Sequence, residues 1–122
     1  MNNHVPLLSQ SMIIVLLLSL SIPLEASSAQ ANDLSIACYA LSRGRGVPEA
    51  TREAFKEIHF RFNTLKEQGK VVTVKNKRIG LEGEHKICAE FVDETDAQRV
   101  WDELQEMTKD LDLANIKKEG CD

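Results

Sequence analysis

The chain has 122 residues, of which 43% are hydrophobic and 28% charged, and its formal net charge is −4 at pH 7. This length favours one domain with a single modest core. The net acidic composition excludes an ordinary nucleic-acid-binding domain, because binding to a duplex needs a concentrated positive field.

The first 31 residues are expected to be a secretory signal peptide, removed to leave a domain of residues 32–122. They contain no Lys or Arg, include the apolar run 12–18 and end in Ala29-Gln30-Ala31, a small-x-small cleavage pattern. Because the basic N-terminal region of an ordinary signal peptide is missing, an uncleaved membrane anchor and a misplaced start codon are alternatives. Lipid attachment at Cys38 is a less favoured alternative. The apolar run falls short of the roughly 20 residues of a spanning helix, so no stable membrane span is expected after cleavage.

The next part of the chain predicts a strand followed by a helix. Residues 34–41 are short and apolar, which is typical of a strand. Residues 42–48 break this pattern, and Pro48 suits the first position of a helix. Residues 49–68 repeat apolar side chains at three- and four-residue intervals, which indicates one buried helix face. Gly69 then ends the helix.

The remainder predicts two strands, a second helix and a last strand. Residues 71–78 and 85–92 are predicted strands joined by a turn that contains glycines. Alternation in the second of them predicts one covered face and one open face. A second helical stripe follows, with Thr95 and Gln98 as a capping box. Residues 114–121 are the predicted last strand.

This order of elements resembles the ferredoxin-like split β-α-β superfold. The resemblance implies an α+β domain, βαββαβ, in which a four-stranded antiparallel sheet of order 4-1-3-2 carries both helices on one face. It covers nearly all of the chain after the signal segment, but no family motif accompanies it. The superfold includes protease-propeptide inhibitors, regulatory ligand-binding modules, metal chaperones and small enzymes, so the resemblance implies architecture and no particular activity.

Three cysteines, Cys38, Cys88 and Cys121, are the disulfide candidates. In the sheet order that the resemblance implies, the strand of Cys38 lies between the other two. Cys88 and Cys121 would then be two strand spacings apart, at about 4.8 Å per spacing, which exceeds normal disulfide reach. We therefore expect Cys38 to pair with Cys88 or with Cys121. The sequence contains no Cys-x-x-Cys motif, so redox chemistry is not favoured. Its His and Cys residues do not have the spacing of metal ligands, so no metal or other cofactor is expected.

The loop after the first strand is the candidate ligand site. Its glycines allow backbone N–H groups to turn toward an anion, and the following helix presents its positive end. The hairpin between the second and third strands should lie at the same end of the sheet. The candidate anion-binding residues are Arg43, Gly44, Arg45, Gly46, Lys77, Arg78 and His85. A plain connecting loop is the alternative.

Two surface features are candidate partner contacts. Phe60 falls nearly opposite the apolar face of its helix, so it is expected in solvent, either as an isolated aromatic or as a homodimer or partner contact. The lysine-rich end of strand 71–78 should lie at a sheet edge. Charge there prevents edge-to-edge aggregation, and strand addition by a partner is the alternative.

No spacing supports a nucleophile with its base, so an enzyme is not favoured. The leading hypothesis is a small periplasmic or secreted protein that binds another extracytoplasmic protein as an inhibitor, immunity factor, chaperone or assembly accessory. The alternative is a module that captures a small anion through Arg43 and Arg45. A thiol redox protein is the third hypothesis.

Overall fold

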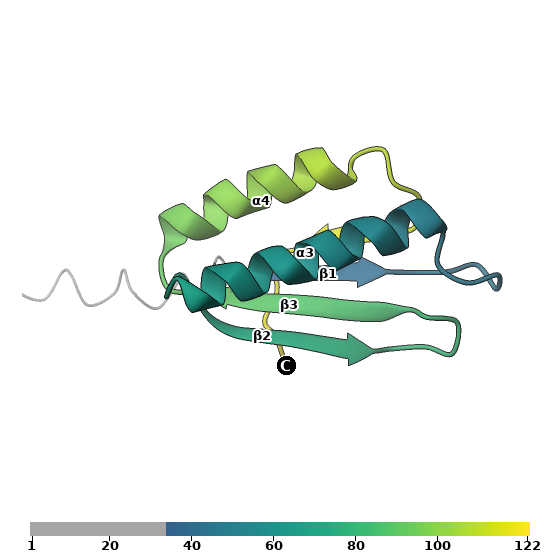
Figure 1. The fold of residues 1–122 in the computed structure, drawn as a ribbon, viewed down its shortest axis with the longest axis horizontal. Coiled ribbons are helices and arrows are strands. Elements are labelled where there is room, and N and C mark those ends of the chain that lie inside the picture. The colour runs from purple at the N-terminus through teal and green to yellow at the C-terminus, as the bar shows by residue number, and fades with distance from the viewer. Residues whose placement is uncertain (1–33) are drawn as a thin grey trace, which may run out of the picture. The chain divides into compact units, whose positions relative to one another are not determined.

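Six elements follow one another in the order β-α-β-β-α-β along residues 34–122, the part of the chain that the computed structural model describes (Figure 1). They are β1 (Ser35–Ala40), α3 (Glu49–Glu67), β2 (Val71–Arg78), β3 (His85–Phe91), α4 (Glu94–Thr108) and β4 (Ala114–Lys117). The predicted signal segment, residues 1–31, lies outside the described residues. Within the described part, no helix has the length and apolar character to cross a membrane.

The strands form one sheet in the order β2-β3-β1-β4, and every neighbouring pair is antiparallel. Both helices lie on the same side of this sheet (Figure 1). The α+β class and the four-stranded antiparallel sheet with two helices are therefore confirmed. Strand β2 lies at one edge and β4 at the other, whereas β1 and β3 are central.

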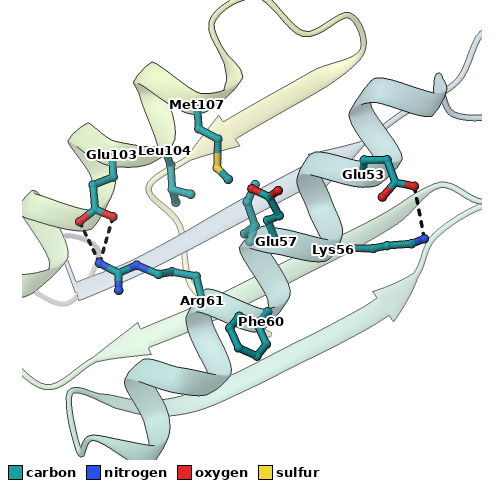
Figure 2. A pocket seen from close by; sticks show the side chains of 9 residues that line it. Glu53, Lys56, Glu57, Phe60, Arg61, Glu103, Leu104 and Met107 are labelled. Carbon is teal, nitrogen blue, oxygen red and sulfur yellow. Dashed lines mark hydrogen bonds and ion pairs between the residues drawn. The ribbon is translucent and has the colours of Figure 1, made fainter.

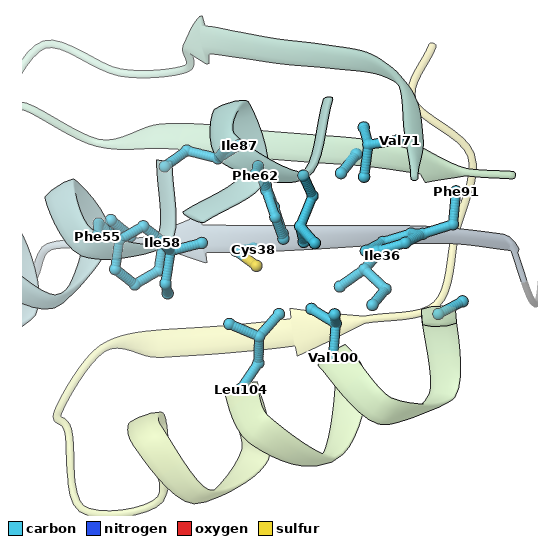
Figure 3. Close-up of a cluster of buried hydrophobic side chains, with 14 of the residues drawn as sticks. Ile36, Cys38, Phe55, Ile58, Phe62, Val71, Ile87, Phe91, Val100 and Leu104 are labelled. Carbon is cyan, nitrogen blue, oxygen red and sulfur yellow. The ribbon is translucent and has the colours of Figure 1, made fainter. Parts of the chain in front are cut away.

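The core fills the space between the helices and the sheet (Figure 3). Phe62 of α3 meets Phe91 of β3 edge-on, with ring centroids 6.2 Å apart. An aromatic pair of this kind contributes about 0.5–1.5 kcal/mol beyond its buried area. The core residues that come from both helices and the two central strands are Ile36, Cys38, Ala40, Phe55, Ile58, Phe62, Leu65, Ile87, Ala89, Phe91, Ala97, Val100 and Leu104.

Local signals explain where each helix begins or ends. Gly69 follows α3 with φ +78°, a left-handed conformation that glycine adopts without strain. Helix α4 begins one residue before Thr95, and the Asp93 carboxylate accepts the Asp96 N–H at 2.8 Å. The predicted capping box at Thr95 and Gln98 is therefore wrong. Asp93 caps the helix because its side chain precedes the first helical residue.

The last strand is shorter than predicted, and this changes the position of Cys121. Strand β4 ends at Lys117, and residues 118–122, called the tail below, leave the sheet edge. Figure 1 shows the tail running beneath the sheet, on the side without helices, toward β2. Cys121 therefore lies under the sheet and not beside β1.

The disulfide joins Cys88 to Cys121, with Cα atoms 5.4 Å apart, and Cys38 is a buried free thiol. The expectation that Cys38 would be the shared partner is wrong. Cys38 lies opposite Ile87 in the register of β1 and β3, so its side chain faces the helices (Figure 3). Cys88 lies opposite Ala37 and faces the other way, toward the tail.

Candidate functional site

The loop that follows β1 meets the hairpin that joins β2 and β3, as expected from the order of the elements. The Gly46 N–H donates to the Glu82 carboxylate at 2.7 Å, and the Ser42 hydroxyl donates to Glu84 at 3.2 Å. Gly46 has φ +84°, a conformation that turns its N–H toward the hairpin. The loop thus presents a backbone donor to a carboxylate, and that carboxylate belongs to the chain itself.

The hairpin carboxylate of Glu84 is stabilised in its charged form. It accepts the Glu82 N–H at 2.8 Å and the Ser42 hydroxyl, and the positive charge of Arg78 lies nearby. These contacts, with the Glu82 N–H as the largest effect, hold the pKa of Glu84 below its ordinary value. The junction between loop and hairpin is therefore negative where the anion hypothesis needs positive charge.

The predicted cations of this site point in several directions. Arg43 forms an exposed ion pair with Asp112 at 3.2 Å, and Arg45 is exposed. His85 packs edge-on against a phenylalanine ring of α3 and contacts a hairpin carbonyl. Lys77 lines a hollow on the far side of the sheet. The structure brings Gly46 to the hairpin, but it does not gather the seven predicted residues around one space.

A second candidate site is the interhelical groove, a hollow of about 450 Å³ between α3 and α4 (Figure 2). Its floor includes Ile58 and Leu104, which are buried, and its rim includes Phe60 and Met107. Phe60 is 74% exposed, as its position on the helix predicted. The groove therefore combines an apolar floor with an exposed aromatic ring.

Charged side chains border the groove. Arg61 of α3 contacts both carboxylate oxygens of Glu103 of α4, at 2.9 and 3.0 Å, and so bridges the two helices. Lys56 pairs with Glu53 along α3 at 3.5 Å. Glu57 points toward the space between the helices (Figure 2) and forms no ion pair within residues 34–122. Three acidic residues, Glu53, Glu57 and Glu103, and two basic residues, Lys56 and Arg61, line the groove, so its border carries an excess of one negative charge.

A third site lies on the open face, the side of the sheet turned away from the helices. It carries Tyr39 of β1, Lys75 and Lys77 of β2, and Lys86 and Cys88 of β3. Together with Cys121 and the end of the tail, they line a hollow of about 250 Å³. The interpretation of the sequence missed this site, although Lys75 and Lys77 alternate along a strand and must share a face.

Tyr39 lies at the centre of the open face. The ammonium groups of Lys86 and Lys117 lie 5.5 and 5.2 Å from the centre of its ring, within cation–π distance. Its hydroxyl donates to the Glu119 carboxylate of the tail. That hydrogen bond, together with partial burial and the nearby negative charge, raises the pKa of Tyr39 to about 12.

Comparisons of the chain with protein-family models, with curated proteins and with solved structures found no significant match. Within residues 34–122, no cluster of three or more His, Cys, Asp or Glu side chains is arranged to hold a metal ion. The burial of Cys38 raises the pKa of its thiol to about 12, which leaves it protonated at neutral pH.

Proposed function

We propose that this chain is a small exported protein with a ferredoxin-like domain, periplasmic or secreted, that binds another extracytoplasmic protein through the interhelical groove. The observation that carries the proposal is Phe60. Its ring is exposed beside a groove with an apolar floor. Contact of this apolar ring with water is unfavourable, and the exposed ring adds little to the stability of the fold. Aromatic side chains, phenylalanine included, are enriched at protein interfaces relative to the rest of the surface.

The charge around the groove defines the partner. Glu57 forms no ion pair within the described residues, whereas the other two acids of the groove, Glu53 and Glu103, pair with Lys56 and Arg61. A partner helix would place its apolar stripe over Leu104 and Met107 and a basic residue beside Glu57. The occupant that we propose is therefore an amphipathic helix with lysine or arginine beside its apolar stripe.

Export is part of this proposal. The cleavage pattern at Ala29-Gln30-Ala31 and the Cys88–Cys121 disulfide both suit an oxidising compartment. N-terminal sequencing of the protein recovered from the envelope or medium should begin at Asn32. Recovery of a chain that begins at Met1 would contradict cleavage.

Site-specific photo-crosslinking tests the groove directly. A benzophenone amino acid in place of Phe60 should capture one partner in cells, and the attached peptide should be a basic amphipathic helix. The same probe at Val72, which is 60% exposed on β2, is the matched control and should not capture it. Substitution Glu57→Lys should weaken binding of the captured helix by about tenfold, equal to 1.4 kcal/mol. Capture of a second copy of this chain, or of nothing, would contradict the proposal.

The alternative, capture of a small anion by the Arg43 and Arg45 loop, has weaker support. The Gly46 N–H already donates to Glu82, so an incoming anion must displace that carboxylate. A thermal shift with phosphate or sulfate that disappears in Arg43→Gln/Arg45→Gln would favour this alternative. The absence of any shift in the wild-type protein would remove it.

A further inference from the structure

We propose that the open face around Tyr39 is a second binding site, and that its ligand is an extended peptide segment rich in Asp or Glu. This site lies on the opposite side of the sheet from the interhelical groove. It therefore does not depend on the proposed function, and each can fail alone.

The first argument is a repulsive pair of lysines. Lys77 of β2 lies directly opposite Lys86 of β3 in the register of the two strands. Like charges at directly opposed positions destabilise a sheet. Lys75 lies on the same face two residues earlier, so three lysines line one hollow. An arrangement that opposes folding indicates a ligand that neutralises it.

These cations form few ion pairs, although Lys86 and Lys117 contact the Tyr39 ring. Lys75 lies 3.4 Å from the Asp122 carboxylate. The Asp122 side chain is fully exposed, so this ion pair is weak. Neither Lys77 nor Lys86 forms an ion pair anywhere in residues 34–122, and Lys117 across β1 forms none either. The chain as a whole is acidic, with a net charge of −4, so the concentration of lysine here is a local feature.

The second argument is the tail, which already occupies part of the face as an acidic peptide. Glu119 accepts the Tyr39 hydroxyl over β1, Cys121 is bonded to Cys88 of β3, and Asp122 reaches Lys75 of β2. The tail thus crosses three strands in order, with a carboxylate at each end of the crossing. The face accepts an extended acidic segment of this chain, and we infer that it accepts another one beside it.

The third argument is the size and lining of the remaining space. The hollow of about 250 Å³ is smaller than ordinary small-molecule pockets, which measure about 300–1,000 Å³. Ile79 at the end of the hairpin adds an apolar wall, and this residue is 42% exposed. A hollow of this size takes one or two side chains of a peptide whose backbone continues across the sheet.

Charge also separates a peptide from larger polyanions. The lysines of the open face surround one small hollow, which a short peptide covers, whereas a membrane or a duplex extends well beyond it. Interactions between exposed charges extend about 8–10 Å at physiological salt, so a short ligand is attracted locally by a protein of net negative charge.

Fluorescence anisotropy of the full chain with a labelled peptide of alternating Glu and Ile tests the inference. Binding should saturate and weaken with added salt, and a peptide with Gln in place of Glu should bind at least tenfold more weakly. Lys77→Gln/Lys86→Gln should weaken binding at least tenfold. Lys66→Gln/Lys70→Gln, which removes two exposed lysines elsewhere, should change it less than twofold.

Two further measurements distinguish a binding site from a structural effect. Lys77→Gln alone should raise the melting temperature, because it removes the repulsion and keeps the contact of Lys86 with the Tyr39 ring, so weaker binding by this variant cannot be attributed to unfolding. Glu119→Gln/Asp122→Asn should strengthen peptide binding several-fold, because Asp122 occupies Lys75 and the charge of Glu119 repels an acidic peptide. Equal binding by the Gln peptide, unchanged binding in Lys77→Gln/Lys86→Gln, or stronger binding to vesicles with anionic lipid than to the peptide would overturn the inference.

Discussion

Cys38 and Cys88 lie on neighbouring strands but on opposite faces of the sheet. In the register of β1 and β3, Cys38 lies opposite Ile87 and Cys88 lies opposite Ala37, so the two cysteines are offset by one residue. Because side chains alternate between faces along a strand, that single residue separates them completely. The Cys38 thiol is buried against the helices, whereas Cys88 faces the tail and is bonded to Cys121.

This separation predicts an inert third thiol. In the native protein, iodoacetamide should leave Cys38 unmodified, because burial raises its thiol pKa to about 12 and excludes the reagent. Denaturation without reductant should allow modification of Cys38 alone. Mass spectrometry of the peptides then locates the label. Rapid native labelling of Cys38, or a disulfide that includes it, would contradict the structure and revive the redox hypothesis.

Loss of the disulfide should destabilise the domain substantially. The bond closes a separation of 33 residues, for which chain entropy predicts a contribution of about 3–4 kcal/mol. Cys88→Ala/Cys121→Ala should therefore lower the free energy of unfolding in urea by up to that amount. Cys38→Ala, which keeps the bond, is the control and should cost about 1 kcal/mol, the centre of the range for single substitutions. An equal loss in both variants would show that the bond adds little.

The elements of the fold were predictable because each has a pattern of its own along the chain. Phe55, Ile58 and Phe62 recur at helical spacing, and the alternation around Ala89 correctly separated a covered face from an open one. The pairing of cysteines was not predictable in this way. Residues 34–41 are apolar on both faces, so their sequence did not show which face Cys38 occupies.

The candidate sites depended on contacts that no local pattern records. The exposure of Phe60 followed from its angle on the helix and was confirmed, whereas the groove beside it needed the placement of α4. The loop was correctly placed near the hairpin, but Glu82 had no signal that marked it as the partner of Gly46. The opposition of Lys77 and Lys86 required the register between β2 and β3.

The start of α4 offers a test of the observed helix cap. Asp93→Ala should destabilise the domain by about 1 kcal/mol, because it removes the acceptor of the Asp96 N–H and a negative charge at the helix N-terminus. Thr95→Ala is the matched control. It lies inside the helix and should change the free energy of unfolding by less than about 0.5 kcal/mol, as exposed positions usually do. The reverse order of the two effects would place the cap at Thr95.

The contact between Tyr39 and Glu119 predicts a dependence on alkaline pH. The chain contains one tyrosine, so absorbance near 295 nm reports this hydroxyl alone. The folded protein should titrate at a pKa of about 12, against an ordinary value of 10. A raised pKa in the folded state means that the neutral hydroxyl is the favoured form. Its contribution to stability is complete below pH 10 and is lost as the pH rises through 12.

Glu119→Gln separates the causes of this shift. The substitution removes the charged acceptor and should return the pKa of Tyr39 most of the way to 10, because the hydrogen bond to Glu119 is its largest cause. Glu90→Gln, which removes an exposed carboxylate from β3 without a contact to Tyr39, should leave the titration unchanged. If Glu119→Gln titrates near 12 like the wild type, the tail does not lie against Tyr39, and the acidic segment that crosses the open face is misplaced.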